Sequence, residues 1–377
     1  MYDVLIAGGS IAGLCCAREA ALGGCSVMVI EDDIEVGTPD HCGGMVSVSA
    51  LQRLQVVPRI KMSSHKVHTA KIFSPSGHSV SINAKTQNVI SIDRRELDKE
   101  VAHQAQKAGA VIRVGTKYVK RTQDGIRTGS EEIACKEFVD ARGIGPLAKN
   151  NPSGIIPCCQ CEVYADWIKP ETVEVHVDAV KYPGFFAWVI PVGDGHGKIG
   201  MAGTRIDPVT TLDKFMTLKG THSVIRRIIS PVWVGGPVKE FVSKEAVIIG
   251  DAAGQTKPTT AGGIFSCGMG GIIAGRMLVK HIFEGSSTES YQRDWNTIFG
   301  GEFSRQLLAR KILGRIDNAT LEKLLKAVTP EMAKSISDSD DFDFHAYAIV
   351  RLLGIKGTAK AAGIVFGEKM RKVLDKV

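Results

Sequence analysis

Short apolar runs flank a glycine turn and a longer helical pattern at the start of the chain. The pattern predicts a strand at residues 4–7, a helix at 11–22 and a second strand at 26–30. A strand, a helix and a strand in this order form a βαβ unit. The next stretch, "DDIEVGTPDHCGGMVS", is too rich in glycine for regular structure and too long for a mere connection. We therefore expect a functional loop there.

The middle of the chain changes to successive strands. Residues 65–90 contain two short alternating runs joined by "SPSG", which indicates a hairpin, and "DRRELDKEVAHQAQKAGA" predicts a helix. "VIRVGT" and "EFVDARG" predict strands of the first domain, and residues 158–203 read as strand after strand. A buried strand in "EAVIIGDAAG" returns to the first domain, and helices are predicted from about residue 290 to the end.

These changes of pattern predict an α/β fold in which a Rossmann-type domain is interrupted by an antiparallel sheet. The predicted nucleotide-binding domain is discontinuous and takes residues 1–64, 88–150 and 240–290. The inserted sheet takes residues 65–87 and 151–239, and a helical region takes 291–377.

Composition indicates a globular chain in a reducing compartment. Of 377 residues, 44% are hydrophobic, and the nine cysteines form an odd set without the spacing of a disulfide framework. We expect no signal peptide and no transmembrane segment, because the longest apolar run, "AGGIFSCGMGGIIAGRMLV", is rich in glycine and broken by Arg276. A cytoplasmic protein is predicted.

The net charge of +7 is spread along the chain. It permits attraction to anionic lipids or phosphorylated substrates, but we find no nucleic-acid-binding module. The stretch "RQLLARKILGRIDNATLEKLLKAV" combines helical apolar spacing with basic residues at 305, 310, 311, 315, 323 and 326. It predicts either a helix on a membrane surface or an ordinary helix pair with a solvated basic face.

"GGSIAG" at residues 8–13 is a dinucleotide-binding motif placed between a strand and a helix. Gly8 permits the tight turn, Ser10 and Ala12 lie where the backbone approaches a pyrophosphate, and Gly13 allows close helix packing. Ser10 departs from the usual glycine but is small. Glu31 ends the next strand and is expected to bind the adenosine ribose hydroxyls.

A second motif decides between NAD and FAD. "AVIIGDAAGQTKPTTAGGI" places Asp251 after a buried strand, where an acid can bind ribityl hydroxyls. Backbone N–H groups near Gly262, Gly263 and Ile264 can meet the flavin pyrimidine ring at a helix N-terminus.

The two motifs together resemble the flavoprotein family that includes aromatic hydroxylases, flavin-dependent halogenases and geranylgeranyl reductases. "VDARG" and "DRRELD" also match the family's signatures, and Arg94 corresponds to its arginine near the flavin. Without the other motifs, Arg94 would be interpreted as a surface ion pair with Asp98. The resemblance implies a para-hydroxybenzoate hydroxylase-like fold and FAD as cofactor, and we assign Val119 to the same cofactor site.

The loop "HCGGMVS" resembles the loop in which geranylgeranyl reductases carry a cysteine and glycines against the flavin. The resemblance places Cys42, Gly43 and Met45 near the isoalloxazine, with Cys42 as the candidate catalytic residue that tunes the flavin or passes on a proton. The alternative is a flexible linker with an inert buried cysteine.

"KYPGFFAWVIPVG" resembles the P-x-x-Y-x-W-x-F-P motif of that family. Phe186, Trp188 and Pro191 are the candidate substrate residues, with Phe186 at the tyrosine position of the motif and Ile190 at its phenylalanine position. Phe186 cannot supply a hydroxyl. The halogenase pattern W-x-W-x-I-P fits partly, but the G-W-K-G-G-S loop of the halogenases is missing.

The resemblance implies an FAD-dependent reductase that saturates prenyl chains of an ether-lipid precursor or prenyl diphosphate, as archaeal members do. Its partners are an isoprenoid lipid, an electron donor (NADPH, ferredoxin or a deazaflavin coenzyme) and a membrane surface on the cytoplasmic side. The open alternatives are an aromatic monooxygenase or halogenase and an electron-transfer flavoprotein that reduces a quinone. "CCQC" lacks the spacing of a zinc or iron–sulfur site, so no metal is expected.

Overall fold

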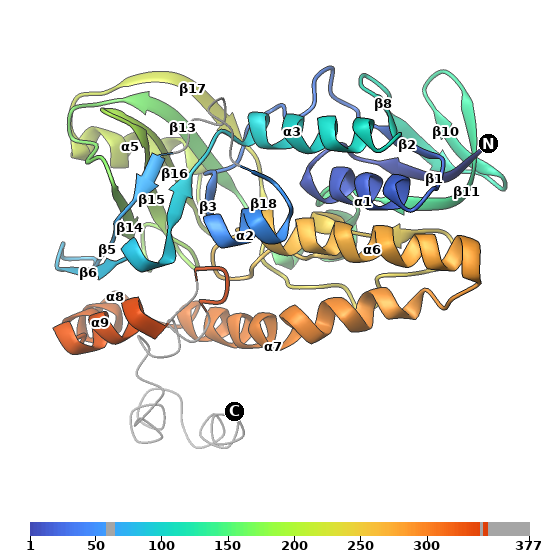
Figure 1. Ribbon diagram of the computed structural model, residues 1–377. Coiled ribbons are helices and arrows are strands. Elements are labelled where there is room, and N and C mark those ends of the chain that lie inside the picture. Colours follow the sequence, from blue (N-terminus) through green and yellow to red (C-terminus); the bar gives the residue numbers. More distant parts are fainter. Residues whose placement is uncertain (58–64, 340–341, 346–377) are drawn as a thin grey trace.

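The computed structural model describes residues 1–57, 65–339 and 342–345. A seven-stranded sheet forms the part that contains the N-terminus (Figure 1). Its central strands are parallel, and β10 and β9 add an antiparallel extension. The order is β8 (Val111–Arg113), β2 (Val27–Ile30), β1 (Tyr2–Ala7), β11 (Glu132–Asp140), β10 (Gly125–Thr128) and β9 (Tyr118–Arg121), with β19 (Val247–Ile248) paired to β11.

Helices cover the parallel strands. The first helix is apolar because it is buried between two others. Figure 1 shows α1 (Ile11–Leu22) between α3 (Arg94–Lys107) and α6 (Ile264–Glu284). α1 is buried along nearly its whole length, so it has no polar face to expose. It lies so close to α6 that a Cβ on Gly271 would come within 2.1 Å of the Ala12 carbonyl oxygen. The glycines of α6 therefore permit the close contact between α6 and α1.

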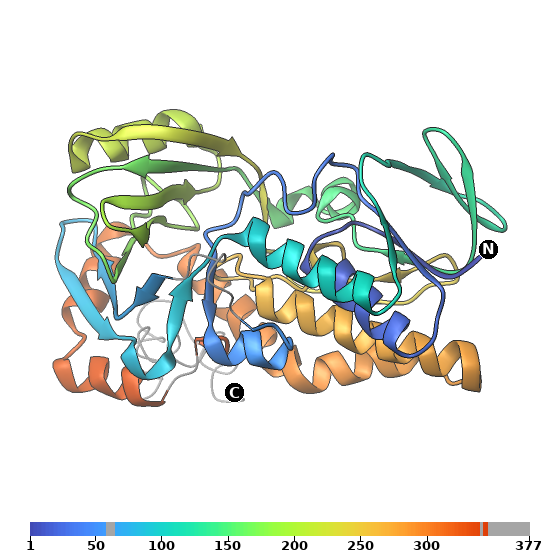
Figure 2. The same cartoon turned by 45° about the horizontal axis from the view of Figure 1, so that its top comes forward.

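A second seven-stranded sheet lies beside the first (Figure 2). All neighbouring strands are antiparallel except β14 and β5. The order is β17 (Ser223–Ile229), β13 (Cys158–Tyr164), β16 (His196–Ala202), β15 (Ala187–Gly193), β14 (Thr172–His176), β5 (Thr69–Phe73) and β6 (Ser79–Asn83). α5 (Pro208–Lys219) covers one face and forms a separate core with it.

Short elements connect the two sheets. A three-stranded sheet contains β3 (Met45–Ser47), β7 (Val89–Ser91) and β4 (His65–Val67), and β12 (Ile155–Ile156) pairs with β18 (Val232–Trp233). The remaining short elements are α2 (Val48–Arg53), α4 (Gly145–Asn150), η2 (Lys85–Gln87), η3 (Pro152–Gly154) and η4 (Gly250–Ala253).

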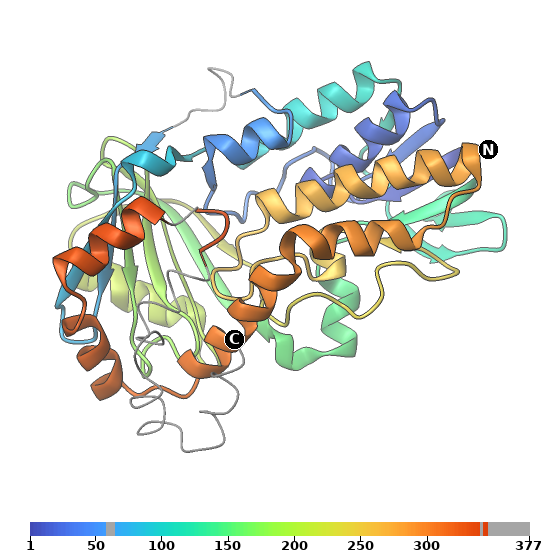
Figure 3. The same cartoon turned by 60° about the horizontal axis from the view of Figure 1, so that its bottom comes forward.

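The C-terminal helices lie along one side of both sheets (Figure 3). α7 (Glu289–Leu313) packs on α6, and α8 (Asn318–Lys326) and α9 (Pro330–Ser339) lie against the second sheet. Leu321 and Leu325 of α8 are buried, so the apolar side of this helix faces the protein and is not available to a membrane surface. The helices predicted after residue 345 lie outside the described residues.

No helix in the described ranges combines the length and the apolar character needed to cross a membrane.

Candidate active site

One cavity of about 1380 Å³ extends between the two sheets. The turns of the first sheet line one end with polar backbone and charged groups. The second sheet and the C-terminal helices line the other end with hydrocarbon, including Ile72, Ile82, Val175, Val177, Leu321 and Leu324. The volume exceeds the roughly 300–1,000 Å³ of an ordinary ligand pocket.

The turn after β1 forms the polar end. Gly8 has a φ of +115°, and a Cβ there would lie 2.2 Å from the Ala141 carbonyl oxygen. Ser10 is the N-cap of α1, but its side chain does not cap the helix and the first turn holds no acidic residue. The first N–H groups of α1 are therefore available to an anion in the cavity.

Glu31 connects this turn to the loop that follows β2. Its Oε2 accepts a hydrogen bond of 2.6 Å from the Gly9 N–H, and its Oε1 accepts one of 3.0 Å from the Asp33 N–H. The carboxylate lines the cavity at the end of β2, about 20 residues after the glycine turn, where the ribose of a dinucleotide is bound in this fold.

The second cofactor motif reaches the same cavity. Asp251 is exposed to it, and its Oδ1 accepts hydrogen bonds from the Thr256 hydroxyl and, at 3.4 Å, from the Cys267 thiol. Gly262 and Gly263 lie at the cavity just before α6, where Ile264 begins the helix. Both motifs therefore lie on one cavity.

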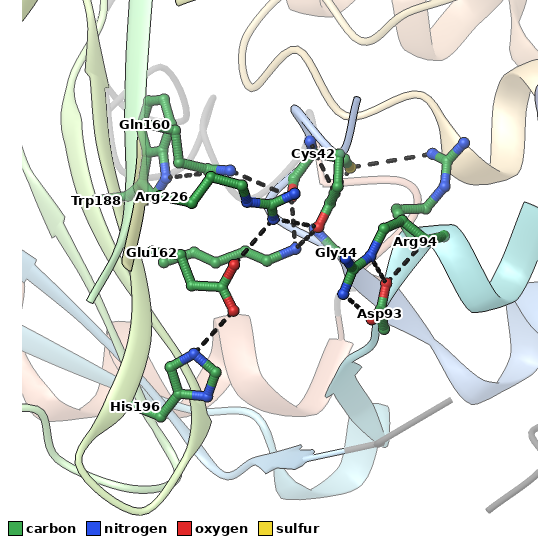
Figure 4. Close-up of polar contacts among 12 residues, drawn as sticks. Cys42, Gly44, Asp93, Arg94, Gln160, Glu162, Trp188, His196 and Arg226 are labelled. Carbon is green, nitrogen blue, oxygen red and sulfur yellow. Dashed lines mark hydrogen bonds and ion pairs between the residues drawn. The ribbon is translucent and has the colours of Figure 1, made fainter. Parts of the chain in front are cut away.

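Cys42 lies between the two ends, in the loop before β3. Its Sγ accepts a hydrogen bond of 3.4 Å from the Gly44 N–H, and Arg94 Nη1 lies 4.0 Å away (Figure 4). Arg94 binds Asp98 through Nη2 at 2.9 and 3.0 Å. Burial alone would lower the pKa of Arg94, but the charge and hydrogen bonds of Asp98, together with contributions from Cys42 and Asp40, outweigh burial and raise the pKa, so the guanidinium remains charged.

The aromatic side chains before and within β15 form a wall of the cavity. Phe185 and Phe186 stack with their ring centroids 4.3 Å apart, and Trp188 meets Phe186 edge-on at 5.9 Å. Alternation along the strand brings Trp188 and Ile190 to the cavity face. The expected aromatic wall therefore lies on the same cavity as both cofactor motifs.

The structure brings together most of the residues expected at the site. The cavity is lined by Gly8, Ser10, Ala12, Glu31, Cys42, Gly43, Met45, Arg94, Asp251, Gly262, Gly263, Ile264, Phe186 and Trp188. Gly13 does not line it but packs against the turn, because a Cβ there would lie 2.0 Å from the Gly8 carbonyl oxygen.

Two expected residues do not reach the cavity. Val119 of β9 is 54% exposed, whereas its neighbour Tyr118 lines the cavity, because successive residues of a strand point to opposite faces. Pro191 misses the cavity for the same reason, and Ile190 lines it. The Pro191 carbonyl accepts a hydrogen bond of 2.6 Å from the Ser91 hydroxyl, so its backbone connects β15 to β7.

Some residues that line the cavity belong to no motif that predicts a site residue. The Arg142 guanidinium lies 3.9 Å from the centroid of the Tyr118 ring, and both line the polar end. Arg142 directly precedes a glycine of the "VDARG" signature, which was the available signal. Gln160 lines the cavity from within "CCQC", and a single glutamine in a strand pattern gives no functional signal.

The described residues contain no group of three or more His, Cys, Asp or Glu side chains arranged to hold a metal. Cys159 and Cys161 lie in the core shared with α5, while Cys158 lines the cavity. The "CCQC" cysteines thus point to both faces of β13, as expected for a strand.

The cavity fits FAD on several grounds. The glycine turn leaves room for a pyrophosphate at the start of α1, and a second glycine pair opens α6 at the same cavity. Arg94 Nε is buried and has no hydrogen-bond partner among the described residues, so an acceptor from a bound molecule is expected there. The residues that would hold FAD are therefore those of the two glycine motifs, with Glu31, Asp251 and Arg94.

Comparison with known proteins identifies relatives of this chain among curated proteins. No family model matches the chain. The digeranylgeranylglycerophospholipid reductase 2 of Methanothermobacter thermautotrophicus is 29% identical over 89% of this chain and 94% of the relative. The protein of the same name from Methanopyrus kandleri is 26% identical over 88% of this chain and 91% of the relative.

Solved structures share the fold. A geranylgeranyl bacteriochlorophyll reductase-like protein of Thermoplasma acidophilum superposes with a TM-score of 0.82 at 22% identity, covering 100% of this chain and 99% of the other. A flavin-dependent brominase superposes with a TM-score of 0.67 at 15% identity over 94% of this chain and 93% of the other.

The fold shared with these structures is a Rossmann-type domain with an inserted antiparallel sheet. In sequence, the chain is similar over most of its length to curated digeranylgeranylglycerophospholipid reductases, so the resemblance expected from its sequence is confirmed.

Proposed function

We propose that the protein is an FAD-dependent reductase that saturates C=C bonds in geranylgeranyl chains of a membrane ether-lipid precursor or a prenyl diphosphate. The names of the curated relatives support this function. The observation that supports it best is the continuous cavity, which is lined by the two glycine motifs at one end and by aromatic and aliphatic side chains at the other. Such a lining binds an isoprenoid by burial, at about 0.8 kcal/mol per CH₂ group.

The chain's own residues have separate parts in this reaction. FAD held by the residues of the two glycine motifs would, once reduced, supply a hydride to one carbon of the alkene. The other carbon needs a proton, and Cys42 Sγ is the group that we propose to hold it, since it lies at the cavity beside the cationic Arg94. Phe186 and Trp188 shape the chamber and exclude water from the reacting bond.

The electron donor and the membrane contact belong to the proposal as well. The sequence contains one dinucleotide motif, so NADPH, ferredoxin or a deazaflavin coenzyme is proposed to meet the flavin transiently. A lipid with two prenyl chains is scarcely soluble. We therefore propose that the protein works peripherally on the cytoplasmic face of a membrane.

The reaction is tested with dithionite-reduced, FAD-loaded protein and a geranylgeranyl lipid or diphosphate. We expect products heavier by successive pairs of hydrogens, detected by mass spectrometry. The proposal fails if the flavin reoxidises without any such increase. Quinone-dependent reoxidation would then favour an electron-transfer flavoprotein, and NADPH oxidation stimulated by a phenol would favour an aromatic monooxygenase.

Phe186→Ala is expected to weaken binding of a prenyl chain. Burial of a phenylalanine contributes about 1.5–3 kcal/mol, so KM should rise by roughly 10- to 150-fold. The measurement is KM for prenyl substrates of several lengths. Phe283→Ala serves as the control, because Phe283 lies on α6 with 58% of its surface exposed. Equal effects of the two substitutions would contradict the assigned wall.

A further inference from the structure

A row of charged residues crosses the second sheet and faces the loop that carries Cys42. Strand register places Arg226, Glu162 and Lys198 directly opposite one another on β17, β13 and β16. Residues opposite one another in a sheet point to the same face. His196 Nε2 lies 2.9 Å from Glu162 Oε1 at the edge of this row (Figure 4).

Asp40 connects the loop to this row. Its Oδ2 lies 2.8 Å from Lys198 Nζ and 3.0 Å from Arg226 Nη2. The side chains of Asp40 and Lys198 are only 2% and 5% exposed. Burial alone would raise the pKa of Asp40, but the charges and hydrogen bonds of Lys198 and Arg226 outweigh it and lower the pKa. The carboxylate therefore stays ionised, and its hydrogen bonds are strong and directional.

The same lysine holds the backbone of Cys42. The Cys42 carbonyl oxygen accepts a hydrogen bond of 2.9 Å from Lys198 Nζ and one of 3.3 Å from Gln160 Nε2. Gln160 Oε1 in turn accepts a hydrogen bond of 3.2 Å from Trp188 Nε1. Two side chains of the second sheet, Lys198 and Gln160, thus fix the peptide that follows Cys42, and Gln160 is hydrogen-bonded to Trp188 of the aromatic wall.

Stability alone does not account for this arrangement, because apolar residues of similar volume often replace a buried ion pair at no cost. The three hydrogen bonds of Lys198 and Gln160 instead converge on the short loop before β3. Gly44 N–H and Arg94 then meet the Cys42 thiol from the other side.

We propose that Lys198 is a positioning residue, which fixes the Cys42 backbone to the second sheet so that the thiol faces Arg94 and the cavity. The inference deepens the proposed function and rests on it for the role of Cys42. Its geometry does not depend on the substrate, so it is tested without turnover.

The test is the rate at which N-ethylmaleimide alkylates Cys42 in the FAD-loaded protein. All nine cysteines lie in the described ranges, and the eight others are buried, so Cys42 reacts first. In Lys198→Met the loop loses a charge-assisted hydrogen bond, and we expect alkylation to become roughly tenfold faster with FAD still bound. Lys219→Met is the matched control, because Lys219 pairs with Glu174 on the same sheet away from the loop. Its rate should equal that of the wild type.

A second variant distinguishes the loss of loop positioning from the effect of leaving Asp40 without its cationic partner. Lys198→Met leaves the buried Asp40 less compensated and can lower stability, whereas Asp40→Asn combined with Lys198→Met removes both charges. We expect the double variant to fold and to keep the fast alkylation, and Gln160→Leu to give a smaller increase. A wild-type alkylation rate in the double variant would overturn the inference. A lack of alkene reduction would instead overturn only the proposed function.

Discussion

Replacing Gly8 with alanine is expected to weaken FAD binding strongly or to destabilise the fold. A Cβ at this position would lie 2.2 Å from the Ala141 carbonyl oxygen and 2.7 Å from its carbonyl carbon, which are backbone atoms that cannot rotate away. The φ of +115° adds strain for any side chain. Together these effects cost about 2–5 kcal/mol, which is more than thirtyfold in the Kd for FAD or an equivalent loss of stability. Flavin absorbance retained after desalting, the Kd from fluorescence quenching and the Tm measure the outcome.

Gly24→Ala is the matched control for this experiment. Gly24 also has a positive φ, of +92°, but a Cβ there would meet nothing within 4 Å. It should therefore show the backbone strain alone, with FAD affinity unchanged. If Gly8→Ala bound FAD as tightly as the wild type does, the turn after β1 would not be the pyrophosphate site.

Cys42→Ala is expected to retain FAD and lose reduction. The thiol is the proton-bearing group that we place beside the alkene, and a positioned proton donor contributes typically 10²–10⁴-fold to a rate. We therefore expect kcat to fall by about 100-fold or more, with the flavin spectrum and the Tm close to those of the wild type. The measurement is single-turnover reoxidation of reduced enzyme by a geranylgeranyl substrate.

Cys158→Ala controls for the loss of a thiol from the cavity. Cys158 also lines the cavity but lies on β13, away from Arg94, and should change kcat little. Loss of FAD from Cys42→Ala would show that the loop has a structural role and would remove Cys42 from the chemistry. Equal losses of kcat in the two variants would contradict a specific proton donor.

Local pattern was sufficient to predict much of the fold. The helix expected at residues 11–22 is α1, and the hairpin signal "SPSG" joins β5 and β6. The formation of these two elements depends on residues that are close together in the sequence. The parallel pairing of β5 with β14 and the packing of α8 against the second sheet depend on contacts between residues far apart, which no local pattern reports.

Some residues of the site could likewise be predicted from local motifs, whereas others depend on long-range contacts. Glycine motifs carry their geometry in sequence, so Gly8 and Gly263 were expected and line the cavity. Val119 and Pro191 each lie one residue from a side chain that lines the cavity, Tyr118 and Ile190, since a strand motif names a stretch but not the face of each side chain. Lys198 had no signal, because its role comes from the register of β16 against β13 and from a loop more than 150 residues earlier.

The hydrocarbon lining at the far end of the cavity has a consequence for how a long chain is handled. Ile72, Ile82, Val175, Val177, Leu321 and Leu324 offer no side-chain hydrogen bonds. Successive isoprene units are nearly alike, so a prenyl chain shifted by one unit makes almost the same contacts and has nearly the same free energy. Under the proposed function we therefore expect the chain to slide along this lining between reductions, so that a longer residence time gives a larger number of reduced bonds.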